Sequence, residues 1–129
     1  MAGIQKRYLK EVDTAGSFSK LQALTSTSTA TAVLPYGVTT ITAGTTVGTN
    51  NFALASPKVA GVHKYIAVTV ATTDAPILSQ ASTATTFFGS TNGLATFSTG
   101  AGEKFLSLVA TSTSVWAVVG QSTGVTFSA

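Results

Sequence analysis

Few side chains in this sequence are of the types that carry out catalysis. His63 is the single histidine, and the four carboxylates are Glu11, Asp13, Asp74 and Glu103. The residue types of a Ser-His-Asp triad are present, because His63 and either Asp13 or Asp74 could activate a serine. However, the chain has no G-x-S-x-G elbow that would expose such a nucleophile. We therefore favour an exposed strand histidine at position 63, and we expect that the protein is not an enzyme.

The same residues are poorly spaced for metal or cofactor binding. The chain has no cysteine, and it lacks the H-x-x-x-H and D-x-D-x-D-G patterns of common metal sites. Asp74 precedes Ala75-Pro76 and Glu103 follows Gly102, and both are positions typical of turns. The segment Gly100–Gly102 lacks the third glycine and the following Lys-Ser/Thr of a phosphate loop. We expect no cofactor, no metal site and no small-molecule substrate, and leave open only a cation on an oligomer axis.

Short strands are the elements that would position these side chains. Thr and Val favour strands because β-branched side chains fit a pleated surface, and 24 of the 129 residues are Thr. Alternating segments separated by turn residues predict one all-β domain of short antiparallel strands, a β-sandwich, jelly roll or barrel. The predicted strands are Val38–Thr42, Asn51–Leu54, Val62–Val70, Ile77–Leu78, Thr86–Phe88, Leu94–Phe97, Phe105–Val109, Val115–Val119 and Val125–Phe127.

Turn residues suggest how some of these strands are joined. Asn92-Gly93 predicts a type I′ turn, and hence a hairpin between Thr86–Ser90 and Leu94–Ser98. The later turn segments predict an antiparallel meander of the last strands. The strict alternation of Thr25–Ala32 fits either a strand or a low-complexity linker, and we favour the strand because β-branched Thr makes a poor flexible linker.

Period-two alternation also predicts which side chains are buried. Val62, Ile66, Val68 and Val70 share one face of their strand, and Lys64 interrupts this face with a stem that can pack and a head that can reach water. Residues expected to pack in the core or in an oligomer interface are Phe97, Phe105, Leu106, Leu108, Trp116 and Val118.

Charge is concentrated at the N-terminus. Six of the eleven charged side chains lie in the first twenty residues, whereas residues 21–57, 75–102 and 105–129 carry none. We interpret 1–20 as an N-terminal arm and 21–129 as the β-domain. The net charge of +3 comes from few charges rather than many, so we expect no specific nucleic-acid binding. No apolar run is long enough to span a membrane, and we expect no membrane partner.

The arm interleaves apolar and basic residues, which favours contact with a neighbouring subunit. The expected contact residues are Ile4, Lys6, Arg7, Tyr8, Leu9, Lys10 and Val12. Their spacing fits an extended segment or a short amphipathic helix equally.

The C-terminal third carries a resemblance. The segments Glu103–Leu108, Trp116–Gly120 and Gly124–Ser128 resemble a hairpin pattern of bacteriophage virion proteins. Together with the Thr/Ser/Ala-rich, cysteine-free composition, this resembles the capsid decoration (cement) proteins of tailed phages. The resemblance implies a homotrimer that binds the major capsid protein and is located on the virion surface after synthesis in the host cytoplasm.

Two alternatives remain from the sequence. The first is a structural protein of a phage fibre, tail or neck, because related β-domains occur there. The second is a carbohydrate- or cell-surface-binding module that uses Tyr36, Tyr65 or Trp116, which would require an exposed aromatic platform.

Overall fold

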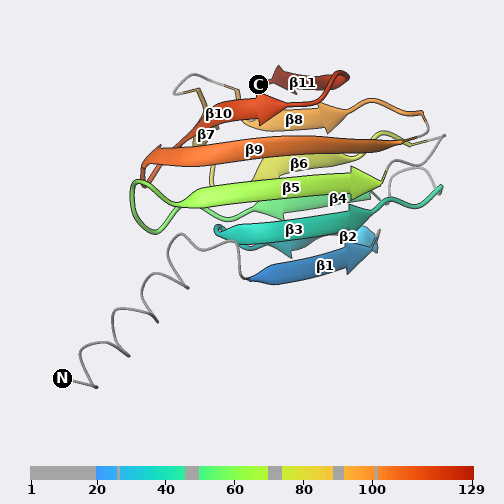
Figure 1. Ribbon diagram of the computed structural model, residues 1–129, viewed down its shortest axis with the longest axis horizontal. Coiled ribbons are helices and arrows are strands. Elements are labelled where there is room, and N and C mark those ends of the chain that lie inside the picture. Colours follow the sequence, from blue (N-terminus) through green and yellow to red (C-terminus); the bar gives the residue numbers. More distant parts are fainter. Residues whose placement is uncertain (1–19, 26, 46–49, 70–73, 89–91, 101) are drawn as a thin grey trace.

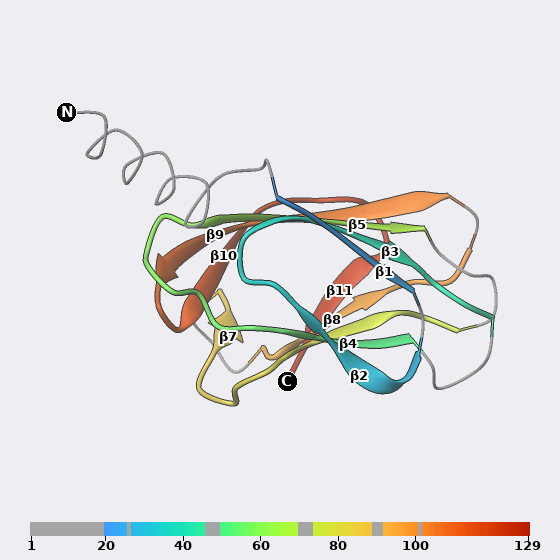
Figure 2. The same cartoon turned by 90° about the horizontal axis from the view of Figure 1, so that it is seen from below.

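The described part of the chain is a two-layer β-sandwich. The computed structural model describes residues 20–25, 27–45, 50–69, 74–88, 92–100 and 102–129. Within these residues the chain forms strands, turns and bends, and two sheets pack face to face, as Figures 1 and 2 show. The predicted all-β class is therefore confirmed.

Each sheet mixes parallel and antiparallel pairs. Sheet A has six strands in the order β1-β3-β5-β9-β10-β7, and sheet B has five in the order β11-β8-β6-β4-β2. The strands of sheet A are β1 (Leu21–Thr25), β3 (Gly37–Thr42), β5 (His63–Thr69), β9 (Glu103–Ser112), β10 (Val115–Gln121) and β7 (Thr86–Phe87). Those of sheet B are β11 (Val125–Ser128), β8 (Leu94–Phe97), β6 (Ile77–Gln80), β4 (Asn50–Leu54) and β2 (Thr27–Val33).

The prediction that the strands are all antiparallel is wrong. From β1 to β9, each successive strand belongs to the other sheet, so β1, β3 and β5 pair in parallel, as do β2, β4 and β6. The first six strands thus wind as a flattened coil. The alternation of buried and exposed residues is the same in a coil and in a hairpin stack, because it reports one buried face and not the direction of the neighbouring strand.

The predicted hairpin at Asn92-Gly93 is also wrong. Strand β7 pairs with β10 in sheet A, whereas β8 pairs with β6 and β11 in sheet B. Neither Asn92 nor Gly93 has the positive φ that a type I′ turn requires, and Phe88 has a φ of 62° instead. Gly93 N donates to Ser128 O at 3.0 Å, so Gly93 already belongs to the hydrogen-bond ladder of sheet B.

The predicted meander is confirmed only for one connection. Strands β9 and β10 form an antiparallel hairpin, but β8 and β11 lie in the other sheet. For Thr25–Ala32 the strand interpretation is correct: β1 ends at Thr25 and β2 begins at Thr27, in the opposite sheet.

The core lies between the sheets and is made of the inward side chains of both. On β5, Ile66 and Val68 are fully buried and Val62 just before it is nearly so, as predicted, whereas Val70 lies outside the described residues. The largest fully buried side chains include Trp116, Phe52, Phe87 and Phe97. Tight packing of such side chains provides most of the favourable free energy of folding.

Candidate functional site

The residues expected to bind a partner through the arm lie outside the described residues. This applies to Ile4, Lys6, Arg7, Tyr8, Leu9, Lys10 and Val12. The described chain begins at Lys20, whose carbonyl oxygen accepts a hydrogen bond from Val38 N at 2.8 Å. This bond starts the pairing of β1 with β3 at the edge of sheet A.

The residues expected to pack fall into two groups. Phe97, Leu106, Leu108 and Trp116 lie in the core, and Val118 packs against it while partly buried. Phe105 instead lies on the outer face of sheet A, where its ring stacks on Tyr65 with centroids 5.8 Å apart and planes 11° apart. Because Trp116 is fully buried, it does not offer the exposed platform that a carbohydrate-binding module would require.

The outer face of sheet A carries little charge across its five longest strands. Two register rows cross it, one of them Leu21, Val38, Tyr65, Ser107 and Gly120, the other Ala23, Thr40, Ala67 and Phe105. Neither row contains an ionisable group other than the phenol of Tyr65, and Leu21 is 67% exposed. A third row, Thr25, Thr42, Thr69 and Glu103, ends in an exposed carboxylate where β9 begins. His63 is exposed where β5 begins, which agrees with the surface position expected for it.

The outer face of sheet B has the same chemistry with smaller side chains. Its two rows are Ala32, Ala53, Ser79, Leu94 and Ser128, and Asn51, Ile77, Thr96 and Thr126. Hydroxyls, methyl groups and one amide make up this surface, without a formal charge. The outer face of sheet B and the two neutral rows of sheet A can therefore approach other proteins without desolvating ions.

Lys64 is the one cation in the interior of the described structure. The sequence predicted that its head would reach water, but the side chain is fully buried, and its Nζ donates to Tyr36 O at 3.0 Å and to Thr39 Oγ1. Thr39 Oγ1 in turn donates to Gln22 Oε1 at 2.9 Å. Burial lowers the pKa of the Lys64 amine to about 7, because desolvation penalises the charged form.

This network links three strands of sheet A to the end of β2. Gln22 lies opposite Thr39 in the β1–β3 register, and its amide crosses to sheet B, where Oε1 accepts from Leu34 N and Nε2 donates to Ala32 O, both at 3.0 Å. Sequence reasoning identified the inward face that holds Lys64 but missed these partners. Lys64 lies opposite Gly37 and not opposite Thr39, so these contacts depend on the parallel pairing of β1, β3 and β5, for which the sequence offered no signal.

The acidic residues and the histidine of the described chain do not gather into a site. Asp74 Oδ2 accepts from Asn50 Nδ2 at 3.2 Å, which fixes the turn before β6. Within the described ranges no three residues of the types His, Cys, Asp and Glu lie close enough to hold a metal ion. No helix in that part of the chain has the length and apolar character to cross a membrane.

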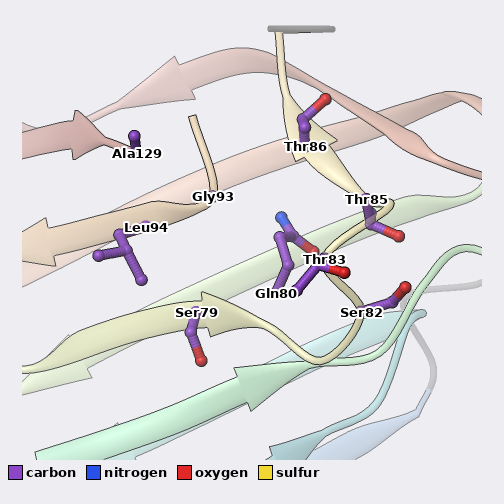
Figure 3. Close-up of a pocket in the computed structure, with 9 residues that line it drawn as sticks. All are labelled: Ser79, Gln80, Ser82, Thr83, Thr85, Thr86, Gly93, Leu94 and Ala129. Carbon is purple, nitrogen blue, oxygen red and sulfur yellow. The ribbon is translucent and has the colours of Figure 1, made fainter. Parts of the chain in front are cut away.

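One cavity of about 440 Å³ lies where β6 leads to β7 and β8 begins. Figure 3 shows its lining residues, which are Ser79, Gln80, Ser82, Thr83, Thr85, Thr86, Gly93, Leu94 and Ala129. The two amide atoms of Gln80 are buried and find no hydrogen-bond partner in the described structure. Because they are closed off from solvent, the cavity offers a ligand mainly hydroxyl and methyl groups, which is too little chemistry to assign a ligand class.

In comparisons with known proteins, no family model, no curated protein and no solved structure matches the chain.

Proposed function

We propose that this protein is a structural component of a tailed-phage particle, a decoration protein that binds and stabilises the lattice of the major capsid protein. The single observation that carries the proposal is the scarcity of formal charge on both outer faces: the two rows of sheet B carry none, and Glu103, where β9 begins, is the one formally charged side chain among the described register positions of the sheet A face. The protein acts through surfaces, as a homotrimer, and does not catalyse a reaction.

Physical reasons connect such faces with a dense protein lattice. Copies that carry a high net charge would repel one another at close spacing, whereas hydroxyl and methyl surfaces do not. A protein that binds only the assembled lattice stabilises it by mass action, because dissociation of the lattice must then also release the bound protein.

Imaging of particles tests this proposal. We expect on the order of hundreds of copies spread over the capsid, placed on symmetry axes where capsomers meet. A small multiple of three or six copies at a single vertex would instead support the fibre, tail or neck alternative. Absence of the chain from purified particles would overturn both.

Charge insertion identifies the face that makes the contact. Thr40→Glu puts a carboxylate on the outer face of sheet A, and Thr126→Glu puts one on that of sheet B; both residues are exposed. Thr113→Glu, in the exposed turn between β9 and β10, is the matched control. We expect one of the face variants to lose occupancy on undecorated particles while the control binds as the unmodified protein does. Equal binding of all three variants would exclude both faces.

A further inference from the structure

Strand β1 is an edge strand without the features that usually protect an edge. It pairs with β3 and with no other described strand. Its sequence, LQALT, contains neither Lys nor Pro, and its five-residue register with β3 runs without a bulge. Natural edges are commonly protected by charge, proline, bulges or shortness, because an open edge can pair with another chain.

The direction of the exposed main-chain groups follows from the register. Lys20 O accepts from Val38 N, so the even-numbered residues of β1 direct their N–H and C=O groups toward β3 in this parallel pair. The N–H and C=O groups of Leu21, Ala23 and Thr25 therefore point away from the sheet. Figure 1 shows β1 at the border of its sheet, with β2 at the same border of the layer behind.

The neighbouring edge, that of β2, is treated differently. Ala55 N donates to Val33 O, so the outward groups of β2 are those of the even-numbered residues. The Gln22 side chain binds Ala32 O and, just after β2 ends, Leu34 N, so its amide supplies one donor and one acceptor as an adjacent strand would. The Gln22 side chain thus caps the end of the β2 edge, whereas the outward main-chain groups of β1 have no partner among the described strands. The other two edges belong to β7 and β11, which span two and four residues.

We propose that the β1 edge binds an extended segment of a partner protein, which adds a seventh strand to sheet A. On the proposed function, on which this inference rests, the partner is a capsid subunit. Main-chain hydrogen bonds to Leu21, Ala23 and Thr25 provide the affinity, and alternate side chains provide the selectivity.

The side chains of β1 define what such a segment must look like. On the inner side, Leu24 is half-buried and packs against the core, so the incoming residue beside it is apolar. On the outer side, Leu21 is largely exposed and continues the row of Val38 and Tyr65, so the residue beside it is also apolar. Strand β1 has no charged side chain that could pair with a charge on the incoming segment. We therefore expect uncharged residues at the positions of the segment that contact β1.

Proline substitution tests this geometry on folded protein. Ala23→Pro removes an outward N–H without breaking a β1–β3 hydrogen bond, and edge strands tolerate such a proline. Ala32→Pro is the matched control, because Ala32 is also an exposed alanine on an edge and its carbonyl stays available to Gln22. We expect both variants to keep the thermal midpoint of the unmodified protein to within a few degrees. Ala23→Pro should bind undecorated particles at least about tenfold more weakly, as loss of one buried hydrogen bond implies, and Ala32→Pro should bind normally.

Hydrogen exchange of the unsubstituted chain gives a second readout. The amides of Leu21, Ala23 and Thr25 should exchange rapidly in the free protein and become protected on particles. Protection in the free protein would mean that the chain covers its own edge, and would overturn the proposal. Normal binding by Ala23→Pro, or unprotected amides on decorated particles, would also overturn it while leaving the decoration function intact. If the unmodified protein does not bind particles, the proposed function itself fails.

Discussion

The buried amine of Lys64 should make stability depend on pH. The pKa is about 7 in the folded protein and 10.5 in an unperturbed lysine, so the unfolded chain binds more protons between these two values. Unfolding free energy should therefore rise with pH across this window, by about 2 kcal/mol from pH 7 to pH 9. Below pH 7 both states are protonated, and the contribution becomes constant.

Denaturant unfolding of the unmodified protein and of Lys64→Met at both pH values measures this effect. Met keeps the stem volume and removes the titrating group, so the difference between the two proteins isolates Lys64. Thr39 keeps its hydrogen bond to Gln22 in the variant. A difference that does not change between pH 7 and pH 9 would show that the amine remains charged in the core.

Trp116 is the largest fully buried side chain and should contribute strongly to stability. Trp116→Ala removes most of its buried apolar surface and leaves a cavity, so we expect a loss of about 3–5 kcal/mol in unfolding free energy. Val119→Ala, on the same strand but 62% exposed, should change stability by less than about 0.5 kcal/mol. Equal midpoints for Trp116→Ala and the unmodified protein would contradict the packing described above.

At the scale of the elements, Gly37 fixes how β3 begins beside β1. Its φ is +71°, and a Cβ at this position would lie 2.6 Å from Lys20 O, the acceptor that starts the β1–β3 ladder. Gly61 has a φ of +90° but open space around a Cβ. Gly61→Ala therefore measures backbone strain alone, and Gly37→Ala should be more destabilising by at least about 1 kcal/mol in thermal or denaturant unfolding. If both variants lost the same unfolding free energy, Lys20 at the start of β1 would have moved away from the new Cβ without a cost in stability.

Strand positions could be predicted from the sequence more completely than strand partners. Alternation of apolar residues reports that one face of a segment is buried, and this placed segments such as Leu94–Phe97 correctly. It is silent on whether the next strand follows in the same sheet or across the core. At Asn92-Gly93 local turn preference competed with tertiary packing, and packing prevailed: Phe88 turns toward β11, where its ring meets that of Phe127 with centroids 4.9 Å apart.

The contacts that distinguish one edge of the sandwich from another depend on which strands pair with each other. Gln22 gives no signal as a single residue, since it reaches Ala32 and Leu34 only because β1 and β2 lie on the same border of opposite sheets. The buried position of Lys64 has the same origin, because its acceptors Tyr36 O and Thr39 Oγ1 come from the neighbouring parallel strand and the residue just before it. Such features follow from topology, which periodicity alone does not specify.

At the scale of the whole molecule, polarity is divided between the two parts of the chain. Residues 1–20 contain six of the eleven charges, whereas the two outer faces of the sandwich offer neutral register rows. On the proposed function, one partner would meet two kinds of contact: neutral surface and main-chain contacts from the sandwich, and mixed apolar and basic contacts from the N-terminal residues. These kinds differ in their response to salt, because screening weakens interactions between charges and leaves apolar contacts in place.

Deletion of residues 2–13 should separate these contributions. The described core contains none of these residues, so we expect the truncated protein to unfold at the same temperature as the full chain. Its occupancy on undecorated particles should fall, because Ile4, Tyr8, Leu9 and Val12 and the three neighbouring cations are lost. Raised salt should weaken binding of the full chain moderately and that of the truncated chain little, since the deletion removes Lys6, Arg7 and Lys10. Equal occupancy and equal salt response of the two proteins would assign all recognition to the sandwich and its β1 edge.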